Sequence, residues 1–242
     1  MPANLANQVA LVTGASSGIG RSVARALAER GAIVCLAGRD ANRLSALRDE
    51  LRAVSPAHAY VCDLVQDTDV RSLRESLGRD HERLDLLVHS AGTINLGRIE
   101  SMPVSELDMQ YRVNLRAPFL LTQALLPLLK AAHGQVVFVN SSVGTRVKEE
   151  VGAYAATKHA LKAIADTLRM ENNQFGIRVL SVYPGNTATP MQQAIQKQTG
   201  QLIAPENLLA PEDVAAVITN ALLLPRTAEV TDINIRPFGK TR

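Results

Sequence analysis

Residues 9–20 read VALVTGASSGIG, an apolar run followed at once by a turn that contains three glycines. The run at 9–12 predicts a buried strand, and Val23, Ala26 and Leu27 at helical spacing predict a helix that begins near residue 19. Glycines at such a turn bring backbone N–H groups close to a pyrophosphate, whose negative charge the helix N-terminus favours. The stretch therefore predicts a dinucleotide-binding loop, rather than a plain turn, made of Gly14, Ser16, Ser17, Gly18, Ile19 and Gly20.

The rest of the chain continues this alternation of strand and helix. Short apolar runs occur at residues 9–12, 33–37, 59–62, 84–88, 136–139, 179–182 and 230–235. Segments with helical spacing include residues 19–30, 42–54, 115–132, 154–173 and 211–223. The pattern predicts a Rossmann-type α/β fold: a doubly wound parallel sheet of about seven strands with helices on both faces. The last run alternates more and is expected at a sheet edge, and residues 1–242 are predicted to form a single domain.

Residues 187–205 show the least regular hydrophobic spacing, because they are polar and include two prolines and one glycine. A loop of this length inside a compact domain is usually functional. We therefore predict that it forms a lid over a substrate site.

Composition excludes several classes of function. The 242 residues carry a net charge of +3, but basic and acidic residues are interspersed and aromatics make up only 3%, which argues against nucleic-acid binding. The chain has no run of about 18 apolar residues and residues 1–7 lack the features of a signal peptide, so we expect a cytoplasmic protein without membrane contact. Cys35 and Cys62 lie in apolar runs and predict buried thiols, and no metal site is expected.

The end of the second apolar run bears on the choice of cofactor. An NAD-binding site places an acid there to hold the ribose 2′-hydroxyl, but this chain has Gly38 and Arg39. Arg39 offers donors suited to a phosphate, so the pair predicts NADP(H) in preference to NAD(H). Asp40 could instead reach the ribose if the alignment shifts by one residue, and a plain surface Arg-Asp pair is the third interpretation.

Two further groups of polar residues suggest proton chemistry. Tyr154 and Lys158 are four residues apart on one helix face, and a neighbouring ammonium lowers the pKa of a phenol, which makes Tyr154 a candidate general acid or base. The alternative is a structural tyrosine beside an unrelated lysine. Ser141 and Ser142 follow an apolar run directly, where ligands bind in open α/β sheets, although paired serines there are more often turn residues.

Together these residues resemble the short-chain dehydrogenase/reductase family of the compact single-domain kind, over residues 8 to about 235. The resemblance implies a catalytic set of Asn114, Ser141, Tyr154 and Lys158, in which Asn114 holds a water of the proton relay. It implies a cofactor site that adds Arg39, Asp63, Ala91, Gly92, Tyr154, Lys158, Pro184, Gly185, Thr187 and Thr189 to the glycine-rich loop. It also suggests a homo-oligomer, a tetramer or a dimer.

Two departures from the family pattern stand out. His89-Ser90-Ala91-Gly92 replaces the usual Asn-Asn-Ala-Gly or Asn-Ala-Ala-Gly, which makes local hydrogen bonding uncertain, and His89 itself is expected to be structural. Residues 229–237 replace the common Gly-Gly ending and resemble the branch that includes hydroxy-acid dehydrogenases and broad carbonyl reductases.

The expected activity is hydride transfer between NADP(H) and a carbonyl or secondary alcohol of a small molecule. One alternative is a non-catalytic nucleotide-sensing or scaffold protein. A sugar-nucleotide epimerase is another, but it would need a second domain for which this chain has no room. Arg146 and Lys148 could attract a carboxylate, although a solvated charge cluster with Glu149 and Glu150 is the more common arrangement.

Overall fold

A seven-stranded parallel sheet forms the centre of the computed structural model, which describes residues 4–238. The strands lie in the order β3-β2-β1-β4-β5-β6-β7. Their bounds are Val9–Thr13, Ile33–Gly38, Ala57–Val61, Leu86–His89, Gln135–Val139, Arg178–Pro184 and Asp232–Ile235 for β1 to β7. This confirms the predicted Rossmann-type fold, and β7 lies at an edge of the sheet as expected.

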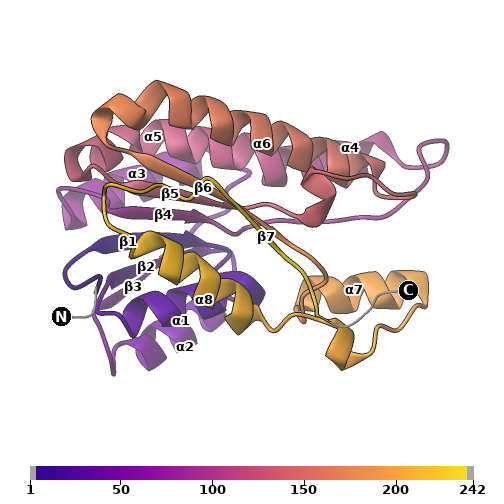
Figure 1. Ribbon diagram of the computed structural model, residues 1–242, viewed down its shortest axis with the longest axis horizontal. Helices are drawn as coiled ribbons and strands as arrows, with labels where there is room; N and C mark the ends of the chain where they lie inside the picture. The colour runs from indigo at the N-terminus through magenta and orange to yellow at the C-terminus, as the bar shows by residue number, and fades with distance from the viewer. Residues whose placement is uncertain (1–3, 239–242) are drawn as a thin grey trace.

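Helices cover both faces of the sheet (Figure 1). Helices α1, α2 and α8 lie on one face, α3, α5 and α6 lie on the other, and α7 stands apart at one end. The bounds of α1 to α8 are Gly18–Ala28, Ala41–Leu51, Asp67–Asp80, Val104–Tyr111, Ala117–Ala132, Gly152–Asn172, Pro190–Thr199 and Pro211–Leu222. A π-helical turn, Arg112–Arg116, joins α4 to α5.

Each face of the sheet has its own aliphatic core. Alternate residues of β1 point to opposite faces, so Ala10 and Val12 pack with α1, α2 and α8, while Val9 and Leu11 pack with α3, α5 and α6. Cys35 and Cys62 are buried, free thiols, in agreement with the prediction. In the described part of the chain, no helix is long and apolar enough to cross a membrane.

The structure corrects several sequence-based boundaries. Helices α3, α4 and α7 were not predicted, and α7 lies inside the segment 187–205 that was expected to be a loop. Their apolar residues are sparse: α3 buries only Val70, Leu73 and Leu77, and α7 fully buries only Gln192. At the end of α5 the cap residue is His133, which has a left-handed backbone with a φ of 50°.

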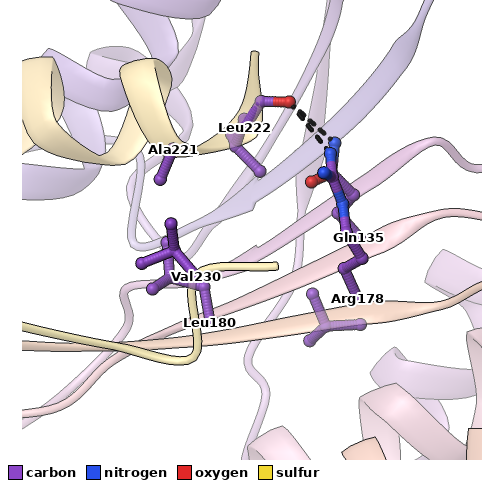
Figure 2. A pocket seen from close by; sticks show the side chains of 7 residues that line it. Gln135, Arg178, Leu180, Ala221, Leu222 and Val230 are labelled. Carbon is purple, nitrogen blue, oxygen red and sulfur yellow. Dashed lines mark hydrogen bonds between the residues drawn. The ribbon is translucent and has the colours of Figure 1, made fainter. Parts of the chain in front are cut away.

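The amino ends of β5 and β6 hold the C-terminus of α8 (Figure 2). Gln135 Nε2 and Arg178 NH2 both donate to the carbonyl of Leu222, at 3.2 Å each. The cavity between these residues is only about 10 Å³, which is close to the space of one water molecule. This end of the sheet is therefore structural, and a substrate-sized site must lie elsewhere.

Candidate active site

A cleft of about 1510 Å³ opens at the carboxyl ends of the strands. The loops that follow β1, β2, β4, β5 and β6 line it, together with α7. Ligands of doubly wound sheets bind at this edge, where the order of strands reverses between β1 and β4. The cleft has room for a dinucleotide and a small substrate together.

The glycine-rich loop occupies the end of this cleft nearest α1. Gly14 has a φ of +63°, and a Cβ there would come within 2.8 Å of the backbone of Ala91. Only glycine allows β1 and β4 to approach so closely, because the left-handed backbone and the contact both exclude a side chain. Ser17 caps α1 without a side-chain hydrogen bond, which leaves the N–H groups of the first turn for a pyrophosphate.

Thr13 joins the two loops that border the cofactor end of the cleft. Its hydroxyl donates to Val88 O at 3.3 Å and accepts from the backbone N–H groups of Ser90 and Ala91 at 3.1 and 3.2 Å. Sequence reasoning did not assign a role to Thr13, since its partners lie more than 70 residues away. The contact fixes the backbone of Ala91 and Gly92, which line the cleft as predicted.

The two residues that follow β2, Arg39 and Asp40, differ in their contacts. Asp40 caps α2 by accepting from Arg43 N at 3.0 Å, and it forms an ion pair with Arg43 Nε at 3.2 Å. Arg39 lines the cleft and is exposed, and it makes no ion pair within residues 4–238. The guanidinium of Arg39 therefore has no ion-pair partner among these residues, whereas the carboxylate of Asp40 already contacts the backbone N–H and the Nε of Arg43.

The other predicted cofactor residues also border the cleft. Asp63 lines it and accepts a hydrogen bond from Val65 N at 3.2 Å. After β6, the segment from Pro184 to Thr189 folds against the glycine-rich loop, since a Cβ on Gly18 would meet Thr189 Cγ2 at 3.0 Å. Thr189 caps α7 by accepting from Gln192 N at 3.2 Å. Lining residues from this segment include Gly185 and Thr187.

Tyr154 and Lys158 lie one turn apart on α6, and both are buried beside the cleft with Ser141. The Lys158 Nζ donates to Val139 O at 3.0 Å and lies 5.7 Å from the centroid of the Tyr154 ring. Ser141 lies two residues beyond the end of β5 in extended backbone, and its Oγ accepts from Val143 N at 3.4 Å. The fold thus brings the three residues together, as the sequence predicted.

The protonation of this group differs from the expectation. Burial raises the pKa of the Tyr154 phenol to about 12, and the neighbouring Ser141 hydroxyl lowers it only in part. Burial also lowers the pKa of Lys158 to about 8. The predicted lowering of the phenol pKa by the ammonium is not seen in this structure, because burial of the ring is the largest cause of the shift. Near neutral pH, Tyr154 keeps its proton and can act as a proton donor.

Asn114 lies in the π-helical turn and is fully buried. Its amide pairs with the backbone of Thr93 in both directions at 2.8 Å, and its Nδ2 also donates to Thr157 Oγ1 at 3.2 Å. Thr157 Oγ1 in turn donates to Tyr154 O at 2.8 Å. The side chain of Asn114 thus ties the loop after β4 to α6, while its implied role in holding a water stays a prediction.

His89 ends β4 on the side of the sheet that faces α5. Its Nε2 lies 2.8 Å from Thr122 Oγ1, and its ring stacks on Phe138 with centroids 4.9 Å apart. Burial lowers the pKa of His89 to about 3, so the ring is neutral at ordinary pH. His89 lies in the core behind the cleft, which agrees with a structural role.

The remaining walls of the cleft are mixed. Ile94, Val143, Val151, Met191 and Ile195 supply apolar surface, while charged and amide side chains, among them Arg146, Lys148, Glu149, Glu150 and Gln196, supply the polar part. No group of three or more His, Cys, Asp and Glu side chains within residues 4–238 could hold a metal ion.

Helix α7 closes over this part of the cleft through one glutamine. Gln198 Nε2 donates to Asn95 Oδ1 at 3.1 Å and to Leu96 O at 2.9 Å, and Gln198 Oε1 accepts from Leu96 N at 3.4 Å. These bonds join α7 to the loop that follows β4. Sequence reasoning missed Gln198, because its partners lie about 100 residues away.

Comparison with known proteins agrees with this geometry. A sequence model of the family described as short chain dehydrogenase matches residues 8–200. An uncharacterized oxidoreductase of Staphylococcus epidermidis is 30% identical over 236 residues, which span 97% of this chain and 99% of that protein.

Solved structures with the same fold include proteins bound to NADP compounds. The RhlG/NADP active-site complex of Pseudomonas aeruginosa is 31% identical, with a TM-score of 0.87 and 98% of each chain covered. An alcohol dehydrogenase of the archaeon Thermococcus sibiricus, complexed with 5-hydroxy-NADP, is 26% identical. Its TM-score is 0.89, and the match covers 97% of this chain and 98% of that one.

Proposed function

Because this chain belongs to the short-chain dehydrogenase/reductase family of oxidoreductases, we propose that it transfers a hydride between NADP(H) and a carbonyl or secondary alcohol. The observation that carries the proposal is the meeting of Ser141, Tyr154 and Lys158 beside one cleft. The glycine-rich loop and Arg39 lie along the same cleft and would hold the cofactor.

In the reductive direction, NADPH supplies the hydride when bound. The phenol of Tyr154 donates a proton to the substrate oxygen, and its high pKa keeps that proton in place until the oxygen gains negative charge. The hydroxyl of Ser141 donates a hydrogen bond to the same oxygen and orients the carbonyl. The ammonium of Lys158 stabilises the phenolate that forms.

The preference for NADP(H) rests on the residues after β2. Arg39 is free to pair with a 2′-phosphate, whereas Asp40 is held by Arg43 and by the N-terminus of α2. Relatives solved with NADP compounds support the same choice of cofactor. The alternative in which Asp40 binds the ribose of NAD(H) would require it to leave both partners.

The substrate is a small molecule, to which the cleft offers both apolar and charged walls. Ile94, Val143 and Ile195 are aliphatic, while Arg146 and Lys148 are exposed and make no ion pair within the described residues. An oxidised hydroxy acid would place its carboxylate near these two cations. An uncharged ketone or diketone would use the aliphatic walls alone.

The test is NADPH oxidation against a panel of ketones, aldehydes, diketones and 3-oxo acids. Tyr154→Phe should lower kcat by at least a hundredfold while the Kd for NADPH changes little, since the variant removes only the proton donor. Near-wild-type kcat in this variant would exclude Tyr154 from the reaction. Tight NADPH binding without turnover of any carbonyl would favour the alternative of a nucleotide-sensing or scaffold protein.

A further inference from the structure

Asn140 lies between β5 and the serine of the active site, and no step of the proposed reaction uses it. Its side chain is buried, with 4% of its surface exposed. Asn140 Oδ1 accepts from Ser141 N at 2.9 Å, and Asn140 Nδ2 donates to Lys158 O at 3.0 Å. Both ends of one amide therefore contact the main chain of two active-site residues.

The same strand end holds Lys158 by its side chain as well. Lys158 Nζ donates to Val139 O, and Asn140 N donates to Val182 O at 2.8 Å, which fixes Asn140 on the sheet. Lys158 is therefore attached to two successive residues of the β5 end, once through its ammonium and once through its carbonyl. Alanine at position 140 would remove the second attachment and leave the first.

Gly144 provides the space that Asn140 occupies. A Cβ at position 144 would collide with Asn140 Oδ1, and it would lie 3.0 Å from Asn140 Cγ and 3.2 Å from Lys158 O. A side chain at position 144 would therefore displace the amide from its two partners. The loop offers a way to disturb Asn140 while the asparagine itself is kept.

We propose that Asn140 is a positioning residue, which sets the place of Ser141 relative to Lys158 and thereby to Tyr154. The inference rests on the proposed oxidoreductase activity, because the distance between these groups matters only if they act on one substrate. Reactions of this kind are sensitive to placement, and a displacement of about 1 Å can cost on the order of a hundredfold in rate. A short side chain at position 140 could not span from Ser141 N to Lys158 O.

The kinetic test is a double-mutant cycle with the best carbonyl of the panel as probe. Asn140→Ala should lower kcat by about ten- to a hundredfold, while the KM for NADPH changes by less than about threefold. In a Ser141→Ala background the further loss should be much smaller, because the serine that Asn140 positions is gone. Equal losses in both backgrounds, or a kcat within threefold of wild type, would overturn the proposal.

A structural measurement separates this inference from the proposed function and from misfolding. Hydrogen exchange at the Ser141 amide should speed up in Asn140→Ala and in Gly144→Ala, while the amides of β5 stay protected. If Asn140→Ala does not fold, Asn140→Ser takes its place, because serine is polar but too short to reach Lys158. If the wild type turns over no carbonyl, the proposed function fails, and the positioning role of Asn140 is then judged from the exchange result alone. Unchanged exchange at Ser141 in a folded variant overturns the role of Asn140.

Discussion

Arg39 and Asp40 are adjacent in the sequence but differ in what they are free to bind. The sequence left open which of them would contact the ribose end of the cofactor. Because Asp40 is already bound to Arg43 at the start of α2, the structure favours Arg39 as the cofactor ligand. The spacing of Tyr154 and Lys158 on one helix made them candidates, and the family resemblance was needed to assign them a catalytic role and to add Ser141. Thr13 and Asn140 could not be found from the sequence, since their importance depends on contacts between segments that are distant in the sequence.

Cofactor preference should reverse when the two residues at the end of β2 are changed. A charge-assisted contact is worth about 1.5–3 kcal/mol, so the wild type should favour NADP(H) over NAD(H) by roughly ten- to a hundredfold in kcat/KM. Gly38→Asp combined with Arg39→Ala should favour NAD(H), because an acid can hold the ribose and repel a 2′-phosphate. A Cβ at position 38 meets only Leu44, at 3.6 Å or more, so the aspartate fits.

Arg43→Ala is the matched control for this switch. It removes a nearby arginine that is already paired with Asp40, and it should change the preference much less than Arg39→Ala does. Steady-state kinetics with both cofactors measures the ratio. A wild type that prefers NAD(H) would refute the role of Arg39 and would point to Asp40 as the ribose ligand.

His89 should make folding stability depend on pH. Its pKa is about 3 in the folded protein and near 6.5 in the unfolded chain, so only the unfolded chain binds the proton between these values. Stability is therefore complete above pH 6.5 and is lost as the pH falls toward 3. From pH 7 to pH 5 the free energy of unfolding should decrease by about 2 kcal/mol through this residue.

Urea denaturation of His89→Asn measures this contribution. The variant should have a flatter dependence on pH between 7 and 5, because an asparagine amide does not titrate in this range. His133→Asn removes a histidine from an exposed helix end and should keep the slope of the wild type. Parallel curves for the wild type and His89→Asn would show that burial of His89 does not cause the slope.

The secondary-structure elements differ in how well the sequence predicts them. All seven strands were placed within about two residues at each end, because strands covered on both faces are apolar throughout. Helices α4 and α7 were missed because each fully buries only one residue, and α3 was missed although Val70, Leu73 and Leu77 follow helical spacing. The hydrophobic pattern of the sequence gives no sign of the π-helical turn, although this turn places Asn114 in the core.

The lid predicted for residues 187–205 can be tested through the contacts of α7 with the loop that follows β4. Gln198→Ala would remove three hydrogen bonds to Asn95 and Leu96, each worth about 0.5–1.5 kcal/mol when formed. Because the lid is exposed, we expect a rise of about three- to tenfold in the KM for the carbonyl, with kcat less affected. Limited proteolysis within residues 187–205 should become faster in the apo variant.

Gln193→Ala is the control on the same helix. Gln193 is exposed, and its side chain makes no hydrogen bond within the described residues. This variant should retain the KM and the cleavage rate of the wild type. Cofactor and substrate together should protect the segment in the wild type, and equal cleavage with and without them would count against a lid.

The two ends of the sheet differ in their roles. The amino ends of the strands are clamped to α8, while the carboxyl ends carry the cleft. A third region, the α4–α5 surface, carries exposed apolar side chains that neither end uses. Its residues are Val104, Leu107, Tyr111 and Phe119, with 70%, 41%, 48% and 49% of their surfaces exposed.

The α4–α5 surface should bury these side chains in a homo-oligomer. Val104, Leu107 and Tyr111 follow helical spacing and form one stripe, and apolar stripes of this kind on a folded protein mark contact surfaces. Leu107→Glu with Tyr111→Glu should shift the mass measured by light scattering from a dimer or tetramer toward the 26.0 kDa protomer, because charges would be buried in the contact. Met170→Glu, at an exposed methionine of α6 outside this surface, should leave the mass unchanged. A wild type that is monomeric at every concentration, or a double variant that keeps its mass, would refute this interface.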